Sequence, residues 1–386
     1  MKLNNISFTG KIIDAHVHSG NWWRNGNLYD HTKDIDLFSK EPLPNGDTVE
    51  KVVVSNLDCM VRTNNTQEPI HFMSDEIEGN IKLAQLAKQN NKLLPLATCQ
   101  PNFGTVDNIK KLFSDNPNVF YGLKFHPEQL NLPANSALCN PYMEFAQKND
   151  LPCLFHSGQT FASAQGVATK VSKPAQIYEL AKRFPKVPVI MAHLGGNEGE
   201  NTLFATKLII ESVTKNNSKL YADISWVDCD NPQKSTLSQV IKILKENNAL
   251  DRIMFGTDAP LGRFGLLGEN NTPPKEAYVN NINDIKKMIK RDFGKESEEI
   301  INKIFYENAQ NLYLKKLWKN NNTHEKITKF FKSKTGLLVS TGLVLLSGIT
   351  CFSLQKFQTN KSQIKNISAV NYNAYNIQKN AIDFLS

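Results

Sequence analysis

The residues of this chain that could do chemistry begin with two histidines one residue apart, His16 and His18. They follow Ile12 and Ile13, an apolar pair typical of a buried β-strand. Side chains alternate between the two faces of a strand, so both imidazoles are expected on the same face. Two imidazoles that converge at the end of a strand supply half of the ligands of a typical metal site.

Further side chains of the kind that bind metals or substrates stand near the ends of later apolar segments. Lys124 and His126 end one segment, His156 the next, His193 the one after it, and Asp258 the last. Each of them alone is explained by a structural role, such as a hydrogen-bonded histidine, a capping carboxylate or a solvated lysine. Five segment ends that all carry such a side chain indicate a shared site, provided that the fold brings these ends together.

Eight short apolar segments are rich in Val, Ile, Leu or Phe, as expected of strands that are buried on both faces. They are Lys11–His18, Val49–Asp58, Leu93–Gln100, Val119–His126, Pro152–Gly158, Pro188–Gly195, Leu220–Trp226 and Arg252–Pro260. Helical patterns lie between several of them, at Glu76–Asn90, Lys173–Phe184, Leu237–Asn247 and Pro274–Lys290.

Repeated alternation of strand and helix predicts a parallel sheet, and eight strands predict a closed (β/α)8 TIM barrel. In such barrels the catalytic side chains sit at the carboxyl ends of the strands. A doubly wound open sheet is the competing fold. It usually carries a Gly-rich phosphate loop after the first strand, and this chain has His16-Val17-His18-Ser19-Gly20 there instead.

The segment between the first two predicted strands, Asn21–Gly46, is long and poorly periodic. We interpret it as a loop over the mouth of the barrel, in part a lid. Trp22 and Trp23 at its start are candidate walls of the pocket.

The motifs at the segment ends resemble those of the amidohydrolase superfamily, and more narrowly the amidohydrolase-related branch that also holds metal-dependent decarboxylases. The motifs are Asp14-Ala15-His16-Val17-His18, Gly122-Leu123-Lys124-Phe125-His126-Pro127, His156-Ser157-Gly158, Ala192-His193-Leu194-Gly195-Gly196 and Gly256-Thr257-Asp258-Ala259-Pro260. The segment Ile304–Leu312 is similar to the terminal helix of this family. The resemblance covers about residues 10 to 316.

The resemblance implies that His16, His18, His156 and Asp258 bind a catalytic metal. One Zn²⁺ is expected, because neutral imidazoles and a carboxylate suit it, with Mn²⁺ or Fe²⁺ as alternatives. Asp258 would also accept a proton from a metal-activated water. His193 would lie just outside the metal ligands, where it orients the substrate and stabilises the developing oxyanion.

Lys124 and His126 lie two residues apart and share a face of their strand. In dinuclear members of the superfamily a carboxylated lysine from the fourth strand bridges two metals, and Lys124 could do the same. We favour the other expectation, in which both residues bind a substrate anion or polarise its carbonyl group. Arg62 and Arg263 are candidates for clamping a carboxylate, although solvated loop residues explain them equally well.

The net charge of +8 is concentrated near the carboxyl end of the chain. Nine lysines and two acidic residues from Lys319 onward carry +7, so the first 318 residues are close to neutral. That distribution argues against a nucleic-acid partner for the main body. The hydrophobic fraction of 40% and the charged fraction of 21% are typical of a folded protein.

Residues 335–354 contain no charged side chain, and twenty helical residues span about 30 Å, the thickness of a bilayer core. We therefore predict a membrane anchor here, preceded by a basic linker at 319–334 and followed by a polar, disordered tail at 355–386. The more basic flank precedes the anchor, which places the barrel of residues 1–318 in the cytoplasm. A helix docked on the barrel is the alternative.

These observations predict a metal-dependent hydrolase that cleaves a C–N or C–O bond of a small carbonyl substrate with a metal-activated water. A metal-dependent non-oxidative decarboxylase of a small carboxylic acid is the first alternative. A membrane-tethered binding module without catalysis is the second. The sequence leaves open the identity of the substrate and whether copies of the chain form a homo-oligomer.

Overall fold

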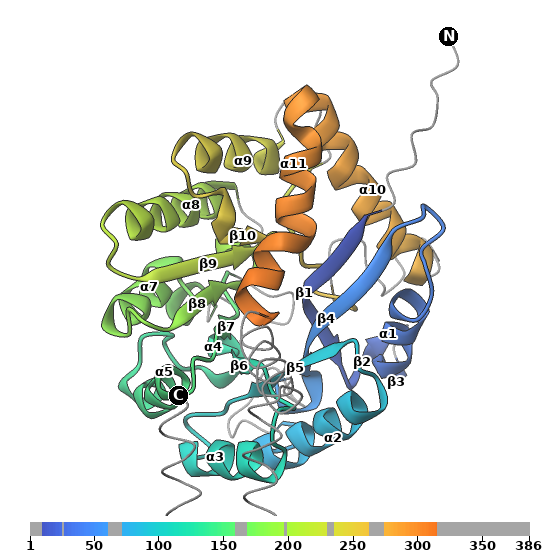
Figure 1. Ribbon diagram of the computed structural model, residues 1–386. Coiled ribbons are helices and arrows are strands. Elements are labelled where there is room, and N and C mark those ends of the chain that lie inside the picture. Colours follow the sequence, from blue (N-terminus) through green and yellow to red (C-terminus); the bar gives the residue numbers. More distant parts are fainter. Residues whose placement is uncertain are drawn as a thin grey trace, which may run out of the picture. The chain divides into compact units, whose positions relative to one another are not determined.

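The computed structural model describes residues 10–24, 27–60, 72–158, 168–196, 199–229, 235–261 and 274–314. Eight parallel strands form one sheet in the order β1-β4-β5-β6-β7-β8-β9-β10 (Figure 1). They are β1 Lys11–Ser19, β4 Thr48–Asn56, β5 Leu93–Thr98, β6 Gly122–Phe125, β7 Cys153–Phe155, β8 Pro188–Met191, β9 Lys219–Asp223 and β10 Ile253–Met254. Each strand overlaps one of the eight predicted segments, so that prediction is confirmed, although several strands are shorter than predicted.

Backbone hydrogen bonds also join the first strand to the residues that follow the last one. The Asp258 N–H donates to the His16 carbonyl at 2.8 Å, and the His18 N–H donates to the Ala259 carbonyl at 2.7 Å. Val17 and Ala259 form an isolated parallel bridge between these contacts. The sheet therefore curves into a nearly closed barrel, and the TIM barrel prediction is confirmed to that extent.

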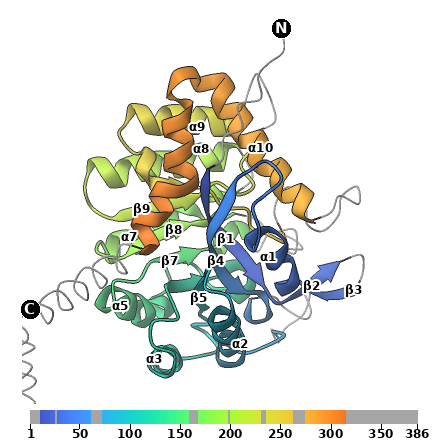
Figure 2. The same cartoon turned by 45° about the vertical axis from the view of Figure 1, so that its right-hand side comes forward.

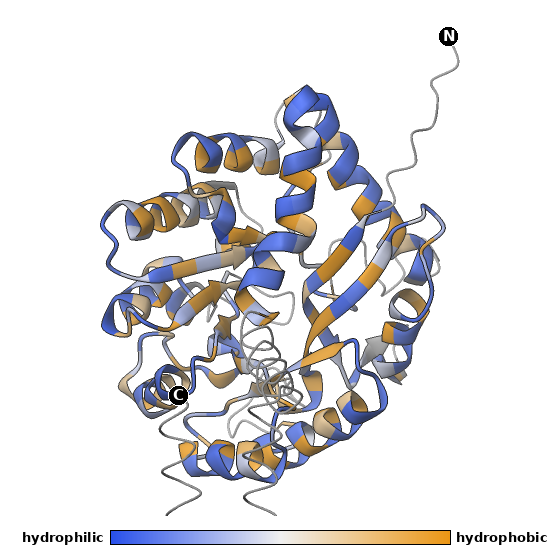
Figure 3. Ribbon diagram, in the orientation of Figure 1, coloured by the Kyte–Doolittle hydropathy of each residue, from blue (hydrophilic) through white to orange (hydrophobic). Residues whose placement is uncertain are grey.

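Helices alternate with the strands and surround the barrel (Figures 1 and 2). They are α1 Thr32–Ser39, α2 Glu76–Gln89, α3 Val106–Asp115, α4 Pro127–Leu130, α5 Asn140–Lys148, α6 Ala168–Val171, α7 Pro174–Arg183, α8 Gly199–Thr214, α9 Thr236–Glu246, α10 Pro274–Phe293 and α11 Ser297–Asn302. The strands are mostly apolar, whereas the helices carry both apolar and hydrophilic residues (Figure 3). This distribution is expected of a sheet covered by amphipathic helices.

The apolar core has two layers. One buried cluster fills the barrel itself and includes Ile13, Leu96, Leu154 and Ile190. A larger cluster lies between the strands and the helices. The helical segment after α11 continues to Leu314, and its Tyr313 joins the inner cluster. The predicted terminal helix at 304–312 is therefore helical.

A β-bulge in β1 aims the two histidines into the barrel. Ile13 and Ala15 belong to the inner cluster, whereas Val17 belongs to the outer one. The pairing of β1 with β4 shifts in register between Asp14 and Val17. An extra residue in a strand reverses which side chains face inward, so the strand places apolar residues in the core and then turns its histidines toward the same interior.

The prediction of a loop at 21–46 was wrong for most of that segment. Strands β2 Asn21–Arg24 and β3 Asn27–Asp30 form an antiparallel hairpin, and α1 follows (Figure 2). Phe38 of α1 is fully buried and stacks on Tyr278 of α10 with 4.2 Å between ring centroids. Both elements are too short to give a clear periodic pattern, although Asn25-Gly26 is a favoured pair between hairpin strands.

Within the described ranges, no helix has both the length and the apolar character needed to cross a membrane. The predicted anchor at 335–354 lies outside those ranges, as do the basic linker at 319–334 and the tail at 355–386. These three assignments remain predictions.

Candidate metal centre

Three ligand-type side chains converge at the carboxyl ends of β1 and β10. The Nε2 atoms of His16 and His18 lie 3.2 Å and 2.8 Å from the same oxygen, Oδ1 of Asp258. All three residues are at least 95% buried. Two buried imidazoles and a buried carboxylate form a donor set that suits a divalent metal, so these residues fit the metal that the resemblance implies. They also form one of the groups of side chains close enough to hold an ion.

The other ring nitrogen of each histidine has its own partner. Nδ1 of His16 lies 3.0 Å from Oδ2 of Asp223, and Nδ1 of His18 lies 3.0 Å from the hydroxyl oxygen of Ser55. Metal-binding histidines are commonly held through the nitrogen that does not face the metal. The arrangement here has that form, with both Nε2 atoms directed at Asp258.

Asp258 is restrained on its second oxygen. The indole N–H of Trp226 donates to Oδ2 at 2.7 Å. Burial alone would raise the pKa of the Asp258 carboxyl group, but the rings of His193 and His16 and the hydrogen bond to His18 hold the pKa well below its usual range. Asp258 is therefore a carboxylate at neutral pH. Burial lowers the pKa of His18 to about 4, despite the opposing effect of Asp258, so its ring is neutral at that pH.

Lys124 of β6 reaches the same place from across the barrel. It is fully buried, and its Nζ atom lies 2.9 Å from Nε2 of His16. Burial lowers the pKa of Lys124 to about 8, although Asp258 and Asp223 raise it. A cation beside this donor set partly balances the charge of the two carboxylates.

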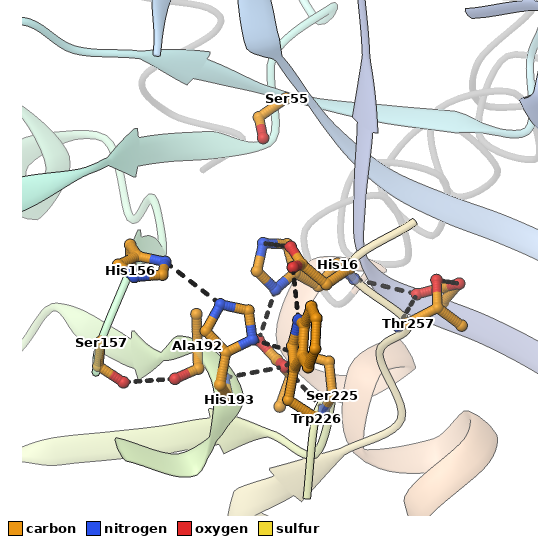
Figure 4. A network of polar contacts seen from close by, with 12 residues as sticks. His16, Ser55, His156, Ser157, Ala192, His193, Ser225, Trp226 and Thr257 are labelled. Carbon is orange, nitrogen blue, oxygen red and sulfur yellow. Dashed lines mark hydrogen bonds and ion pairs between the residues drawn. The ribbon is translucent and has the colours of Figure 1, made fainter. Parts of the chain in front are cut away.

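His126, His156 and His193 form a second part of the site. The rings of His126 and His156 stack with 4.1 Å between centroids. Nδ1 of His156 lies 3.2 Å from Nε2 of His193, whose Nδ1 lies 2.7 Å from the hydroxyl oxygen of Ser225 (Figure 4). Nε2 of His156 is buried, forms no hydrogen bond with a described residue, and lies 3.5 Å from a carboxylate oxygen of Glu128.

The structure brings together His16, His18 and Asp258, but His156 belongs to neither group of described residues that could hold a metal. The second such group consists of His16, His193 and Asp223. The role of His156 as a fourth ligand remains a prediction.

Left-handed backbone conformations place three of these side chains. His193, Trp226 and Asp258 have φ values of 58°, 64° and 58°. Such conformations cost about 1 kcal/mol for residues other than glycine, and they occur often at functional sites. Gly256 leaves room for two residues of the site, because a Cβ atom there would come within 3.0 Å of the Cβ atoms of His16 and Asp223.

A family model described as amidohydrolase matches residues 118–315, just over half of the chain. The chain belongs to the amidohydrolase family. This family was the one expected from the motifs at the strand ends. No curated protein matches the chain.

Several solved structures resemble this amidohydrolase family member. A probable 2-pyrone-4,6-dicarboxylic acid hydrolase from Acinetobacter baumannii is 15% identical, with a TM-score of 0.48 over 78% of this chain and 98% of that chain. A putative enzyme of the same name from Pseudomonas putida is 11% identical, with a TM-score of 0.49 over 78% and 97%. A 5-carboxyvanillate decarboxylase from Novosphingobium aromaticivorans is 12% identical, with a TM-score of 0.45 over 73% and 78%.

Sequence reasoning missed several polar residues of the site in this family member. Asp223 is the last residue of β9, Ser225 and Trp226 follow that strand, and Ser55 is near the end of β4. The strand-end rule that identified the histidines would also have found these four, had it been applied to the second and seventh strands. Arg62 and Arg263 lie outside the described residues, so the predicted carboxylate clamp remains a prediction.

Proposed function

We propose that this protein is a metal-dependent hydrolase that cleaves a C–N or C–O bond of a small carbonyl substrate. The observation that supports the proposal best is that Nε2 of His16 and Nε2 of His18 both lie within 3.2 Å of Oδ1 of Asp258. One divalent metal, for which Zn²⁺ is the first candidate and Mn²⁺ or Fe²⁺ the next, would polarise a carbonyl and lower the pKa of a water toward about 7.

The protein's own residues would supply the proton transfers and the orientation. Asp258 is ionised, so it can accept a proton from the attacking water and return it to the leaving group. Trp226 fixes the position of that carboxylate through its second oxygen. His193 faces the same interior and can orient the substrate or the attacking water through its Nε2 atom. Lys124 and His126 would bind the substrate's anionic or carbonyl group.

A metal titration of the full chain tests the proposal. We expect about one equivalent of Zn²⁺ or Mn²⁺ per chain by calorimetry, and little or none for the His16→Asn, His18→Asn and Asp258→Asn variants. His126→Asn is the matched control, because it removes a histidine of the site that is not an expected ligand. His156→Asn decides whether a fourth ligand exists. Less than about a tenth of an equivalent in the native chain, after expression with Zn²⁺ supplied, would refute the metal-dependent function.

A non-oxidative decarboxylase is the second candidate, because the buried cation of Lys124 provides a partner for a substrate carboxylate. The two reactions differ in their products. Incubation of the metal-loaded protein with lactones, amides and aromatic or enol carboxylates would be followed for ring opening, amine release and CO₂. CO₂ release without incorporation of water would replace the hydrolase proposal with the decarboxylase.

A further inference from the structure

Asp223 lies at the centre of the hydrogen-bond network that joins β1, β8 and β9. It is fully buried. Its Oδ1 atom accepts from the backbone N–H groups of His193 and Ser225, both at 3.1 Å, and from the Ser225 hydroxyl group. Its Oδ2 atom remains for His16, at 3.0 Å.

We propose that Asp223 is a positioning residue that fixes the tautomers of His16, His193 and His156, so that His16 and His156 each present an unprotonated Nε2 atom. The inference rests on the proposed metal site, because its consequence is that Nε2 of His16 is available as a ligand, and that Nε2 of His156 is unprotonated if this ring is the predicted fourth ligand.

The first arm of the network joins Asp223 to His16. A carboxylate only accepts hydrogen bonds, so the hydrogen between Asp223 and His16 must be on Nδ1 of the ring. The neutral ring then carries a lone pair on Nε2. On the other side, Nε2 faces both a donor, the Lys124 ammonium group at 2.9 Å, and an acceptor, Oδ1 of Asp258 at 3.2 Å, so the contact with Asp223 is the one that selects the tautomer.

The second arm starts at the other oxygen of the same carboxylate. The Ser225 hydroxyl group donates its one hydrogen to Asp223, so its oxygen accepts from Nδ1 of His193 at 2.7 Å. Nε2 of His193 therefore carries a lone pair and accepts from Nδ1 of His156 at 3.2 Å. A neutral His156 is left with an unprotonated Nε2, the buried atom that forms no hydrogen bond.

His18 provides an internal comparison. Its Nδ1 contacts the hydroxyl group of Ser55, which can either donate or accept. That contact selects no tautomer. The contact at Nε2 does, because Oδ1 of Asp258 at 2.8 Å only accepts, so the tautomer of His18 does not depend on Asp223.

Two variants separate the arms. In Asp223→Asn the amide oxygen stays with the two backbone N–H groups, and the amide N–H₂ faces His16. Nδ1 of His16 must then accept, which moves the ring hydrogen to Nε2 and blocks the ligand position. Ser225→Ala breaks the second arm and leaves the contact with His16 in place. Ser55→Ala is the matched control, since it removes a partner of a histidine without imposing a tautomer.

The measurement is a long-range ¹H–¹⁵N spectrum of the metal-free full chain, with histidine signals assigned from single His→Asn variants. We expect hydrogen on Nδ1 of His16, His193 and His156 in the native chain. In Asp223→Asn, His16 alone should move its hydrogen to Nε2, and metal affinity should fall about 10- to 100-fold. Ser225→Ala should release His193 and His156 while His16 keeps its tautomer.

A native spectrum with hydrogen on Nε2 of His16 or of His156 would overturn the inference, and this result does not depend on whether Asp223→Asn and Ser225→Ala fold. An Asp223→Asn variant that binds metal as tightly as the native chain would overturn it as well. If Asp223 served only to hold the backbone turn, the variants would lose stability while the histidine tautomers stayed unchanged. Absence of metal binding by the native chain refutes the proposed function instead, and the spectrum still decides the role of Asp223.

Discussion

Trp226 shows how a single hydrogen bond can limit what a catalytic carboxylate does. Asp258 offers one oxygen to His16 and His18 and the other to the indole N–H at 2.7 Å. The carboxylate is thereby fixed in rotation, which keeps its Oδ1 atom directed at the two imidazoles. Sequence reading placed Asp258 correctly at a strand end but could not identify this partner, because a Trp–Asp contact between two strands leaves no local pattern.

We expect Trp226→Phe to lower metal affinity or kcat/KM by about 10-fold, because the ring remains but Asp258 loses its restraint. Calorimetric metal titration and kinetics on the substrate found by screening would measure the change. Tyr178→Phe is the control, since it removes a polar group from an aromatic ring at Asn217, outside the site. Equal effects of both substitutions would contradict a specific role for Trp226.

Substitution of Lys124 distinguishes a site with one metal, in which Lys124 binds substrate, from a site with two metals bridged by a carboxylated Lys124. If it binds substrate, Lys124→Met should retain about one metal per chain and lower kcat/KM by about 100-fold, the usual cost of losing a group that stabilises developing charge. Metal analysis and steady-state kinetics would measure both quantities. Lys51→Met, on β4 and outside the site, should change neither. A native chain with two metals that falls to one in Lys124→Met would support a bridging carboxylated lysine instead.

At the scale of elements, the contact between β1 and the end of β10 assembles the site. Asp14 on β1 accepts hydrogen bonds from the hydroxyl and backbone N–H of Thr257 at 2.7 Å and 3.0 Å, and from the Tyr278 hydroxyl at 3.1 Å. These bonds hold Asp258, the next residue, opposite the histidines. Asp14 thus positions Asp258 through the backbone, and it also accepts from the backbone N–H of His16 at 3.2 Å.

Burial raises the pKa of Asp14 from its ordinary value of 3.8 to about 7, despite the hydrogen bonds from Thr257, His16 and Tyr278. The folded protein therefore holds this proton more tightly than the unfolded chain. The stability that depends on it is present below pH 4 and is lost as the pH rises through about 7.

As the pH rises from 4 to 8, we expect the unfolding free energy of Asp14→Asn to increase by up to about 4 kcal/mol relative to that of the native chain, because the asparagine does not titrate. Urea denaturation of both metal-free proteins across this range would measure the difference. A difference that stays constant with pH would show that Asp14 is not the group responsible.

At the scale of the whole molecule, the segment at 335–354 sets the predicted cellular location. We expect the full chain to sediment with membranes and a chain that ends at Lys334 to stay in the supernatant, because the uncharged segment matches the thickness of a bilayer. Fractionation of cells expressing each form would measure this. If both forms stay in the supernatant, the segment is not an anchor.

The sequence alone determined the eight strands, the order of the barrel and the shared face of His16 and His18. These features depend on periodicity and on position along a strand, which are local. It also indicated the family, because the five motifs occur in order at the strand ends. It did not reveal the hairpin β2–β3 and α1, whose short elements are stabilised by packing, such as Phe38 on Tyr278.

Only the tertiary structure decided which partners surround each histidine. The β1 bulge, which turns His16 and His18 into the barrel after Ile13 and Ala15, depends on pairing with β4 and not on any residue of β1 alone. Asp223 lies 207 residues from His16 along the chain and 3.0 Å from it in space. Hydrogen bonds over such separations leave no periodic trace, so the sequence names the histidines, while the fold decides which of their nitrogens are available.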